Sequence, residues 1–240
     1  MSLLIASYNI HRCYGRDGQY DPQRIKQVLH ALNAEVIALQ EVELLHDAPG
    51  LLEFFCENIP GSNNPACKSW TAIPGLTLTR DSGHYGNAIL TCLPIRSVQR
   101  IDLSLPGREP RGALHVSLEY QGAPLVVIAT HLGLRPAERR AQIRRLLAVL
   151  ENDEAASDQA IITVLMGDLN EWFLWGRPLR WLQRYFQPGF APASFPACCP
   201  FFALDRIWAK PRRVLGEVKV VSNKLTRVAS DHLPLIARIE

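Results

Sequence analysis

Short apolar segments that end in, or adjoin, an amide, carboxylate or imidazole residue recur along almost the whole chain. The apolar parts are the length of strands rather than of helices, and several are continuous enough to be buried on both faces. The polar residues beside them are Asn9, Gln40, Glu41, Asn87, His131, Asp168, Asn170, Asp205, Asp231 and His232. Because open sheets form binding sites where their strands end, this pattern predicts that these side chains converge on one site.

Each of these residues also has a purely structural explanation. An Asp or Asn after a strand is usually a turn residue or a helix cap, and Asp231-His232-Leu233-Pro234 reads equally well as a turn. His131 alone is more often a hydrogen-bonded structural histidine. The repetition of the pattern at the ends of so many apolar segments nevertheless favours a common functional site.

Helices are predicted where apolar residues repeat at helical spacing. One starts after Asp21 with Pro22 in its first turn, and its apolar stripe runs from Ile25 to Leu32. A second starts at Pro136, and weaker patterns cover residues 178–185 and 51–58. Strands are predicted at residues 3–9, 36–40, 86–92, 111–119, 125–129, 161–165, 204–209, 216–221 and 234–239, with loops at residues 60–69 and 187–200.

The length and composition fit one folded unit. The chain has 240 residues, of which 48% are hydrophobic and 20% charged, values typical of a globular protein with a large core. We therefore expect a single domain over residues 1–240, in which two packed sheets are flanked by helices.

The composition also narrows the cellular setting. No apolar run approaches the ~20 residues that span a bilayer, and no basic segment precedes an apolar one at the start, so we expect a cytoplasmic protein without a transmembrane segment. Six cysteines are then expected to be reduced thiols, with a Cys56–Cys67 disulfide as the less favoured alternative. A net charge of +3 is too small to indicate nucleic-acid binding by itself.

The ordered motifs resemble a known superfamily. They are Ser7-Tyr8-Asn9-Ile10, Leu39-Gln40-Glu41-Val42, Gly86-Asn87-Ala88-Ile89-Leu90, Thr130-His131-Leu132, Gly167-Asp168-Leu169-Asn170, Leu204-Asp205-Arg206-Ile207 and Ser230-Asp231-His232-Leu233-Pro234-Leu235. In this order they resemble the endonuclease/exonuclease/phosphatase, or deoxyribonuclease I-like, superfamily. This superfamily includes abasic-site endonucleases, bacterial sphingomyelinases and inositol-polyphosphate 5-phosphatases. A finer resemblance, to a small group of bacterial members, rests on residues 131–135 and on Ser194-Phe195-Pro196.

The resemblance implies a fold and a metal. The expected fold is a four-layer α/β/β/α sandwich with two central, mostly antiparallel or mixed sheets. The expected activity is divalent-metal-dependent hydrolysis of a phosphoester, with Mg²⁺ or Mn²⁺ bound mainly by Glu41 and supported by Asn9 and Asp231. Oxygen ligands suit these hard cations, and no cysteine takes part.

The same resemblance assigns catalytic roles. Asp168 orients or deprotonates the attacking water, and Asn170 holds a phosphate oxygen. His232 stabilises the pentacovalent phosphoryl group, with Asp205 keeping its ring charged. His131 stands where some relatives have a second histidine that acts as an acid.

The acidic partner that this second histidine has in the nuclease relatives is not evident in the sequence. Asp81 and Glu109 are the candidates for the partner of His131.

The sequence indicates the identity of the substrate less clearly than the type of reaction. Asn87, Arg111 and Trp172 are candidate substrate contacts, although Arg111 is equally well explained as an exposed strand arginine. Aromatic residues after Asn170 could stack on nucleic-acid bases or sit at a membrane interface beside a lipid headgroup. The arginines at the start of the second predicted helix are best explained as its solvated face. These arginines are Arg135, Arg139, Arg140, Arg144 and Arg145.

Three functions therefore remain open for a protein expected to be a monomer. The first is a phosphodiesterase or nuclease, and the second is a phosphodiesterase or phosphatase that acts on a small or lipid phosphoester. The third, a catalytically inactive binding protein, is disfavoured because all the expected catalytic residues are present.

Overall fold

The computed structural model describes residues 2–59, 67, 69–156 and 161–240. In this part of the chain, one mixed sheet has six strands in the order β10-β11-β1-β2-β4-β3. The strands are β1 (Leu3–Asn9), β2 (Val36–Leu45), β3 (Thr71–Arg80), β4 (Gly83–Thr91), β10 (Lys219–Val220) and β11 (Leu235–Ile239). β1 pairs with β2 in parallel, and the other neighbours are antiparallel.

The second sheet has five strands within the described residues, in the order β5-β6-β7-β8-β9. They are β5 (Ile95–Asp102), β6 (Gly112–Tyr120), β7 (Ala123–His131), β8 (Ile162–Asp168) and β9 (Asp205–Lys210). Only the β7–β8 pair of this sheet is parallel. The expectation of two mixed, mostly antiparallel sheets is confirmed.

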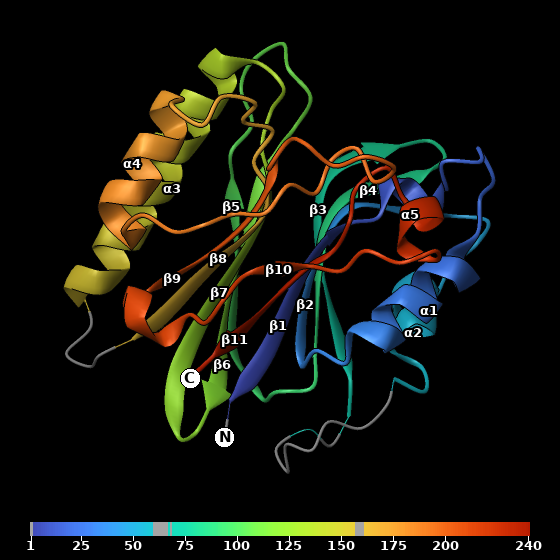
Figure 1. Ribbon diagram of the computed structural model, residues 1–240, viewed down its shortest axis with the longest axis horizontal. Coiled ribbons are helices and arrows are strands. Elements are labelled where there is room, and N and C mark those ends of the chain that lie inside the picture. Colours follow the sequence, from blue (N-terminus) through green and yellow to red (C-terminus); the bar gives the residue numbers. More distant parts are fainter. Residues whose placement is uncertain (1, 60–66, 68, 157–160) are drawn as a thin grey trace.

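Helices cover the outer faces of both sheets (Figure 1). The helices α1 (Pro22–Leu32), α2 (Leu51–Cys56) and α5 (Thr226–Ala229) lie on the first sheet, and α3 (Pro136–Ala156) and α4 (Arg177–Phe186) lie on the second. Apolar side chains from both sheets form the central core between them, as alternating residues of each strand face inward. The result is the predicted α/β/β/α layering.

The local sequence explains how α1 begins and ends. The Asp21 carboxylate accepts a hydrogen bond from the Arg24 amide at 2.9 Å, and Pro22 needs no amide partner in the first turn. Asn33 ends the helix with a left-handed backbone, a conformation that asparagine tolerates well. The buried stripe between these ends is the apolar repeat seen in the sequence.

Two strands, β3 and β5, are absent from the sequence prediction. The inner part of β3 is interrupted by Pro74 and Gly75, and β5 is an exposed edge strand, so neither carries a clear apolar alternation. The strand predicted at residues 216–221 is limited to the short β10. The predicted loop at residues 187–200 has no helix or strand beyond an isolated bridge of Phe195, whereas most of the loop predicted at 60–69 lies outside the described residues.

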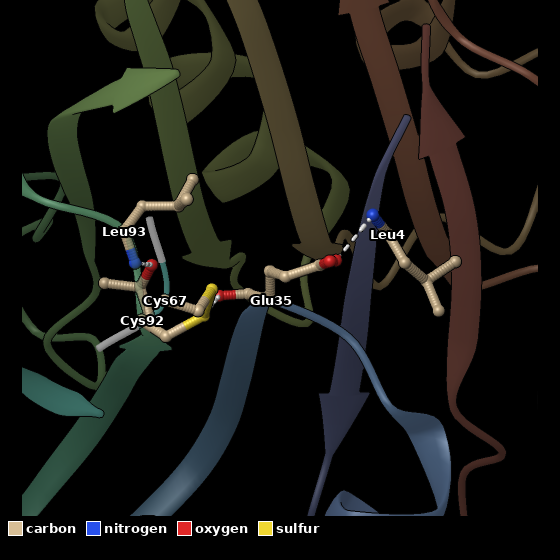
Figure 2. Close-up of a disulfide and its surroundings, with 6 residues drawn as sticks. Leu4, Glu35, Cys67, Cys92 and Leu93 are labelled. Carbon is tan, nitrogen blue, oxygen red and sulfur yellow. Dashed lines mark hydrogen bonds between the residues drawn. A yellow bond between two sulfur atoms is a disulfide. The ribbon is translucent and has the colours of Figure 1, made fainter. Parts of the chain in front are cut away.

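The cysteine prediction is wrong for one pair. Cys67 and Cys92 form a disulfide with a Cα–Cα distance of 4.6 Å, and Cys56 is a free thiol, so neither six reduced thiols nor a Cys56–Cys67 bridge is correct (Figure 2). Cys92 directly follows β4, and the Cys92 amide donates to the Glu35 carbonyl at 3.2 Å. The Glu35 carboxylate in turn accepts from the Leu4 amide at 2.8 Å.

The helices in the described part of the chain do not have the properties of membrane-spanning segments. No helix there combines the length and the apolar character needed to cross a bilayer.

Candidate active site

The strand register brings the predicted residues to one edge of the two sheets. Asn9 lies beside Gln40 at the end of the parallel β1–β2 pair, and His131 lies beside Asp168 at the end of the parallel β7–β8 pair. The antiparallel β9 starts at this edge, with Asp205 opposite Asp168. Strands that enter and leave at the same edge therefore concentrate polar side chains there.

Glu41 reaches the site through an irregularity in β2. The pairing of β2 with β4 shifts register between Leu39 and Val42, and Glu41 has a left-handed backbone with φ of 56°. This conformation is costly for a residue with a side chain, and such strain is concentrated at functional sites. The bulge allows consecutive residues of β2 to serve different purposes, since Gln40 is fully buried while Glu41 lines the open cavity.

A cavity of about 350 Å³ opens at this edge. From the predicted set, the lining residues are Glu41, Arg111, His131, Asp168, Asn170, Trp172, Asp231 and His232. Asn9 and Asp205 contact these residues directly, as described below. Asn87 does not line the cavity; its amide donates to the Gly112 carbonyl at 3.2 Å, next to Arg111. The predicted set thus supplies eight of the fifteen residues that line the cavity.

Asn9 links the two sheets at the base of the cavity. Its Nδ2 lies 3.1 Å from Glu41 Oε1 and 3.1 Å from Asp168 Oδ2, to both of which it donates. Its Oδ1 accepts from the His11 amide at 3.1 Å, and its carbonyl accepts from the Ser230 hydroxyl at 2.8 Å. One buried amide thus fixes carboxylates from both sheets in a common geometry.

His232 is held between two carboxylates. Its Nδ1 lies 2.8 Å from Asp205 Oδ2, and its Nε2 lies 3.7 Å from Asp168 Oδ2. The Ser194 hydroxyl donates to the same Asp205 oxygen, and the Phe195 ring packs against the imidazole at 4.8 Å between centroids. Burial alone lowers the pKa of His232, but Asp205 and Asp168 more than offset it and raise the pKa to about 10. The ring is therefore an imidazolium at neutral pH.

His131 is in the opposite state. Its Nδ1 lies 3.0 Å from Arg111 Nη1, and its Nε2 lies 3.0 Å from Asn170 Nδ2, so both ring nitrogens face N–H donors. Burial lowers the pKa of His131 to about 3, with the Arg111 cation acting in the same direction and Asp168 against it. The ring is neutral at physiological pH.

The acidic partner sought for His131 is replaced by a cation. Glu109 pairs with Arg111, at 3.2 Å between Oε1 and Nη2, and Arg111 occupies the Nδ1 side of the His131 ring. The carboxylate that approaches His131 is Asp168, 3.6 Å from Nε2. Arg111 is thus a buried component of the site and not an exposed strand arginine.

Glu41 and Asp231 carry the charges available to a cation. Burial raises the pKa of Glu41; the Asn9 hydrogen bond opposes this shift, and the Asp231 and Asp168 carboxylates add to it. Because crowded carboxylates are each destabilised by their neighbours, a divalent cation among them would favour their ionised forms. The all-oxygen donors fit Mg²⁺ or Mn²⁺.

A second group of candidate ligands overlaps the first. Asp168, Asp205 and His232 present ligand atoms within 4.8 Å of one another. A metal at this point would have to compete with the Asp205–His232 hydrogen bond.

Several residues of the site had escaped prediction. Ser194 and Phe195 support Asp205 and His232 from a loop, and Arg12 lines the cavity from the turn after Asn9. The motif Ser194-Phe195-Pro196 was visible in the sequence, but its role became clear only from these contacts.

The prediction of a solvated arginine face is wrong at one position of α3. Arg139 is 1% exposed and pairs with the 4% exposed Glu171 at 3.0 Å. The pair stays buried because the guanidinium also donates to the Leu134 carbonyl at 2.6 Å. It fastens α3 to the segment that follows Asn170.

Known proteins resemble this chain over its whole length. The protein YbhP of Escherichia coli strain K12, described as uncharacterized, is 28% identical over 99% of this chain and 96% of its own. An endonuclease/exonuclease/phosphatase structure from Beutenbergia cavernae superposes with a TM-score of 0.74 at 21% identity, covering 100% of this chain and 71% of that one. A TDP2 structure from D. rerio complexed with single strand DNA product has a TM-score of 0.69 at 15% identity, covering 100% and 99% of the two chains.

The family follows from a match that spans nearly all the elements around the cavity. The model of the Endonuclease/Exonuclease/phosphatase family matches residues 6–232, from the strand that ends in Asn9 to the histidine paired with Asp205. The chain therefore belongs to the endonuclease/exonuclease/phosphatase family.

Proposed function

We propose that the protein is a divalent-metal-dependent phosphodiesterase that uses a water molecule as its nucleophile. The observation that carries this proposal is the arrangement of Asp205, His232 and Asp168, in which a carboxylate-bound imidazolium and a second carboxylate face one cavity. Hydrolysis of a phosphodiester needs a water activated on one side of phosphorus and positive charge at the phosphoryl oxygens. This arrangement supplies both.

Asp168 is the residue that orients and deprotonates the water. Its Oδ1 accepts from the backbone amide of Asn170 at 2.8 Å, and its Oδ2 accepts from the side-chain amide of Asn9. Both oxygens are therefore fixed before a substrate arrives. His232 then donates from Nε2 to a phosphoryl oxygen, while Asp205 holds Nδ1 and keeps the ring charged. Preorganised donors of this kind stabilise the transition state without reorganisation during the reaction.

Glu41 would hold the metal, with Asn9 and Asp231 in support. A bound Mg²⁺ or Mn²⁺ supplies positive charge to the phosphoryl and leaving-group oxygens. The Asn9 amide orients Glu41 Oε1, and His11 Nδ1 lies 3.9 Å from Asp231 Oδ1. Both carboxylates line the cavity, and the Asn9 hydrogen bond holds that of Glu41 in place.

Asn170 and Arg111 complete the proposed substrate contacts. The Asn170 amide holds a phosphate oxygen, and the Arg111 guanidinium adds charge at the cavity wall. His131 contributes as a neutral ring whose one unprotonated nitrogen accepts from either Arg111 or Asn170, because its low pKa removes it as a general acid at neutral pH. Trp172 closes one side of the cavity.

The substrate class has two candidates. A nuclease activity is supported by the likeness to a fold that holds single strand DNA in the D. rerio structure. A specific observation supports a lipid or small phosphoester instead: large apolar side chains are exposed beside the cavity at residues 172–175.

An activity panel tests the proposal. Wild-type protein is incubated with Mg²⁺ or Mn²⁺ and plasmid DNA, single-stranded RNA, bis-p-nitrophenyl phosphate, sphingomyelin or inositol phosphates. We expect turnover of at least one diester, and loss of that turnover in Asp168→Ala. Turnover by Asp168→Ala at the wild-type rate would refute the mechanism.

A further inference from the structure

Large apolar side chains gather at the mouth of the active-site cavity. Leu174 is 64% exposed, Trp175 is 73% exposed and Leu134 is 65% exposed. With these we group Trp172, Phe173 and Phe201, also exposed, and call the six residues the apolar rim. Soluble proteins rarely expose so many large apolar residues in one place unless that surface binds a ligand, a membrane or another protein.

Contacts between the rings make the rim continuous with the catalytic residues. Trp172 packs edge-on against Phe202 at 4.6 Å and Phe195 at 5.8 Å between centroids, and Phe195 packs against His232. Phe202 contacts Phe201, and Phe173 contacts Trp175. Trp172 and Leu134 also line the cavity, so whatever covers the rim lies at the cavity mouth.

The chain segment that carries most of the rim has ionic charges of one sign only. Residues 172–204 contain no Asp or Glu. The same stretch presents exposed Arg177 at the start of α4, two residues after Trp175, and exposed Arg135 adjoins Leu134. An apolar surface bordered by cations complements a partner that is apolar within and anionic at its surface.

An anionic phospholipid bilayer has this chemistry. Tryptophan and phenylalanine rings settle at the headgroup boundary, leucines enter the acyl region, and arginines contact the lipid phosphates. Nucleic acid fits less well, because Leu134 and Leu174 have no planar face on which a base could stack. We propose that the apolar rim docks the protein on an anionic phospholipid surface and brings the cavity to the headgroup phosphates.

The proposal concerns the partner of the proposed active site and rests on the proposed function only for the step that follows docking. A headgroup phosphodiester that enters the cavity between Trp172 and Leu134 would meet His232 and Asp168. Docking itself requires neither metal nor turnover, so the two ideas can fail separately.

The test is co-sedimentation of the full chain with vesicles of phosphatidylcholine, with or without about a third phosphatidylglycerol. The wild type is compared with a Leu174→Glu/Trp175→Glu double variant, which places charge where the bilayer would be. Phe190→Glu is the matched control, since Phe190 is as exposed as Trp175 but follows Gly189, which lies beside Trp208 and Arg212. Hydrolysis of bis-p-nitrophenyl phosphate is measured for all three.

We expect the wild type and Phe190→Glu to bind the anionic vesicles, and the double variant to bind at least about tenfold more weakly. Soluble-diester hydrolysis should be equal in all three. Absence of wild-type binding, or equal binding by the double variant, would overturn the docking proposal. So would loss of single-stranded DNA binding, in place of vesicle binding, in the double variant. Lack of wild-type hydrolysis would instead count against the proposed function.

Discussion

Two histidines approach the same carboxylate, yet one ring is protonated and the other is neutral at neutral pH. His232 and His131 each place Nε2 within 4 Å of Asp168 Oδ2, and both are buried. The difference comes from the other ring nitrogen, which faces the Asp205 carboxylate in one case and the Arg111 guanidinium in the other. The site therefore contains one protonated and one neutral histidine at neutral pH.

The first prediction concerns Asp205→Asn. Asp205 is the largest contribution that raises the pKa of His232 to about 10, so the amide should lower this pKa and leave the ring neutral at a lower pH. Turnover at pH 8 should fall on the order of a hundredfold, and the alkaline limb of the pH–rate profile should move to lower pH. Steady-state hydrolysis measured from pH 5 to 10 checks this; an unshifted alkaline limb would show that His232 does not act as the cation.

The identities of the site residues could be predicted more completely than their protonation states. Asn9, Glu41, Asp168 and His232 stand in short motifs beside strands, so the sequence itself points to them. The contact of Arg111 with His131 joins residues on separate strands, and its consequence for the pKa depends on burial. Neither property is encoded locally, which explains why the partner of His131 could not be found from sequence.

At the scale of elements, a buried ion pair connects α3 to the segment after β8. Arg139 on α3 contacts Glu171, which directly follows Asn170. Removing one member of a buried pair leaves an unpaired charge in a medium that solvates it poorly. The position of Asn170 should therefore depend on this pair.

The second prediction concerns Arg139→Met. We expect this variant to lose about 3 kcal/mol of unfolding free energy, and the Arg139→Met/Glu171→Met double variant to lose less, because it buries no lone charge. Arg140→Met, a change at the half-exposed neighbour, should be nearly neutral. Urea denaturation of the three variants measures the differences. A double variant less stable than Arg139→Met would contradict this account of the pair.

Elements with a strong periodic signal were predicted, and those without one were not. α1, α3 and the buried strands β7 and β8 have continuous or helically spaced apolar residues, because their environments demand them. The edge strand β5 is almost wholly exposed, so its residues need not be apolar and show no regular apolar pattern. Pairing with β6 holds β5 in place, and pairing is a property of two segments.

At the scale of the whole molecule, one disulfide ties the chain segment before β3 to the end of β4. Cys67 and Cys92 are 25 residues apart in the sequence, and closing such a loop reduces the conformational entropy of the unfolded chain. This bridge joins parts of the chain that the sequence alone gave no reason to pair. It is a feature typical of oxidising compartments, which makes the predicted cytoplasmic location worth testing directly.

The third prediction follows from this cross-link. Cys92→Ala should unfold in one cooperative transition, as expected for a single domain, with about 3 kcal/mol less stability than the oxidised wild type. Dithiothreitol should lower the wild-type melting temperature and leave that of Cys92→Ala unchanged. Cys56→Ser, at a free thiol, is the control. Equal melting temperatures for oxidised wild type and Cys92→Ala would show that the bridge does not stabilise the fold.

The most direct test of metal-dependent hydrolysis at this site is the rate of bis-p-nitrophenyl phosphate hydrolysis as a function of Mg²⁺ concentration. Wild type should be inactive in EDTA and saturate with Mg²⁺, whereas Glu41→Gln should need at least about tenfold more Mg²⁺ for half-maximal rate. Asp168→Asn should show no turnover at any concentration. Turnover that persists in EDTA, or a Glu41→Gln curve that overlies the wild-type curve, would contradict the account.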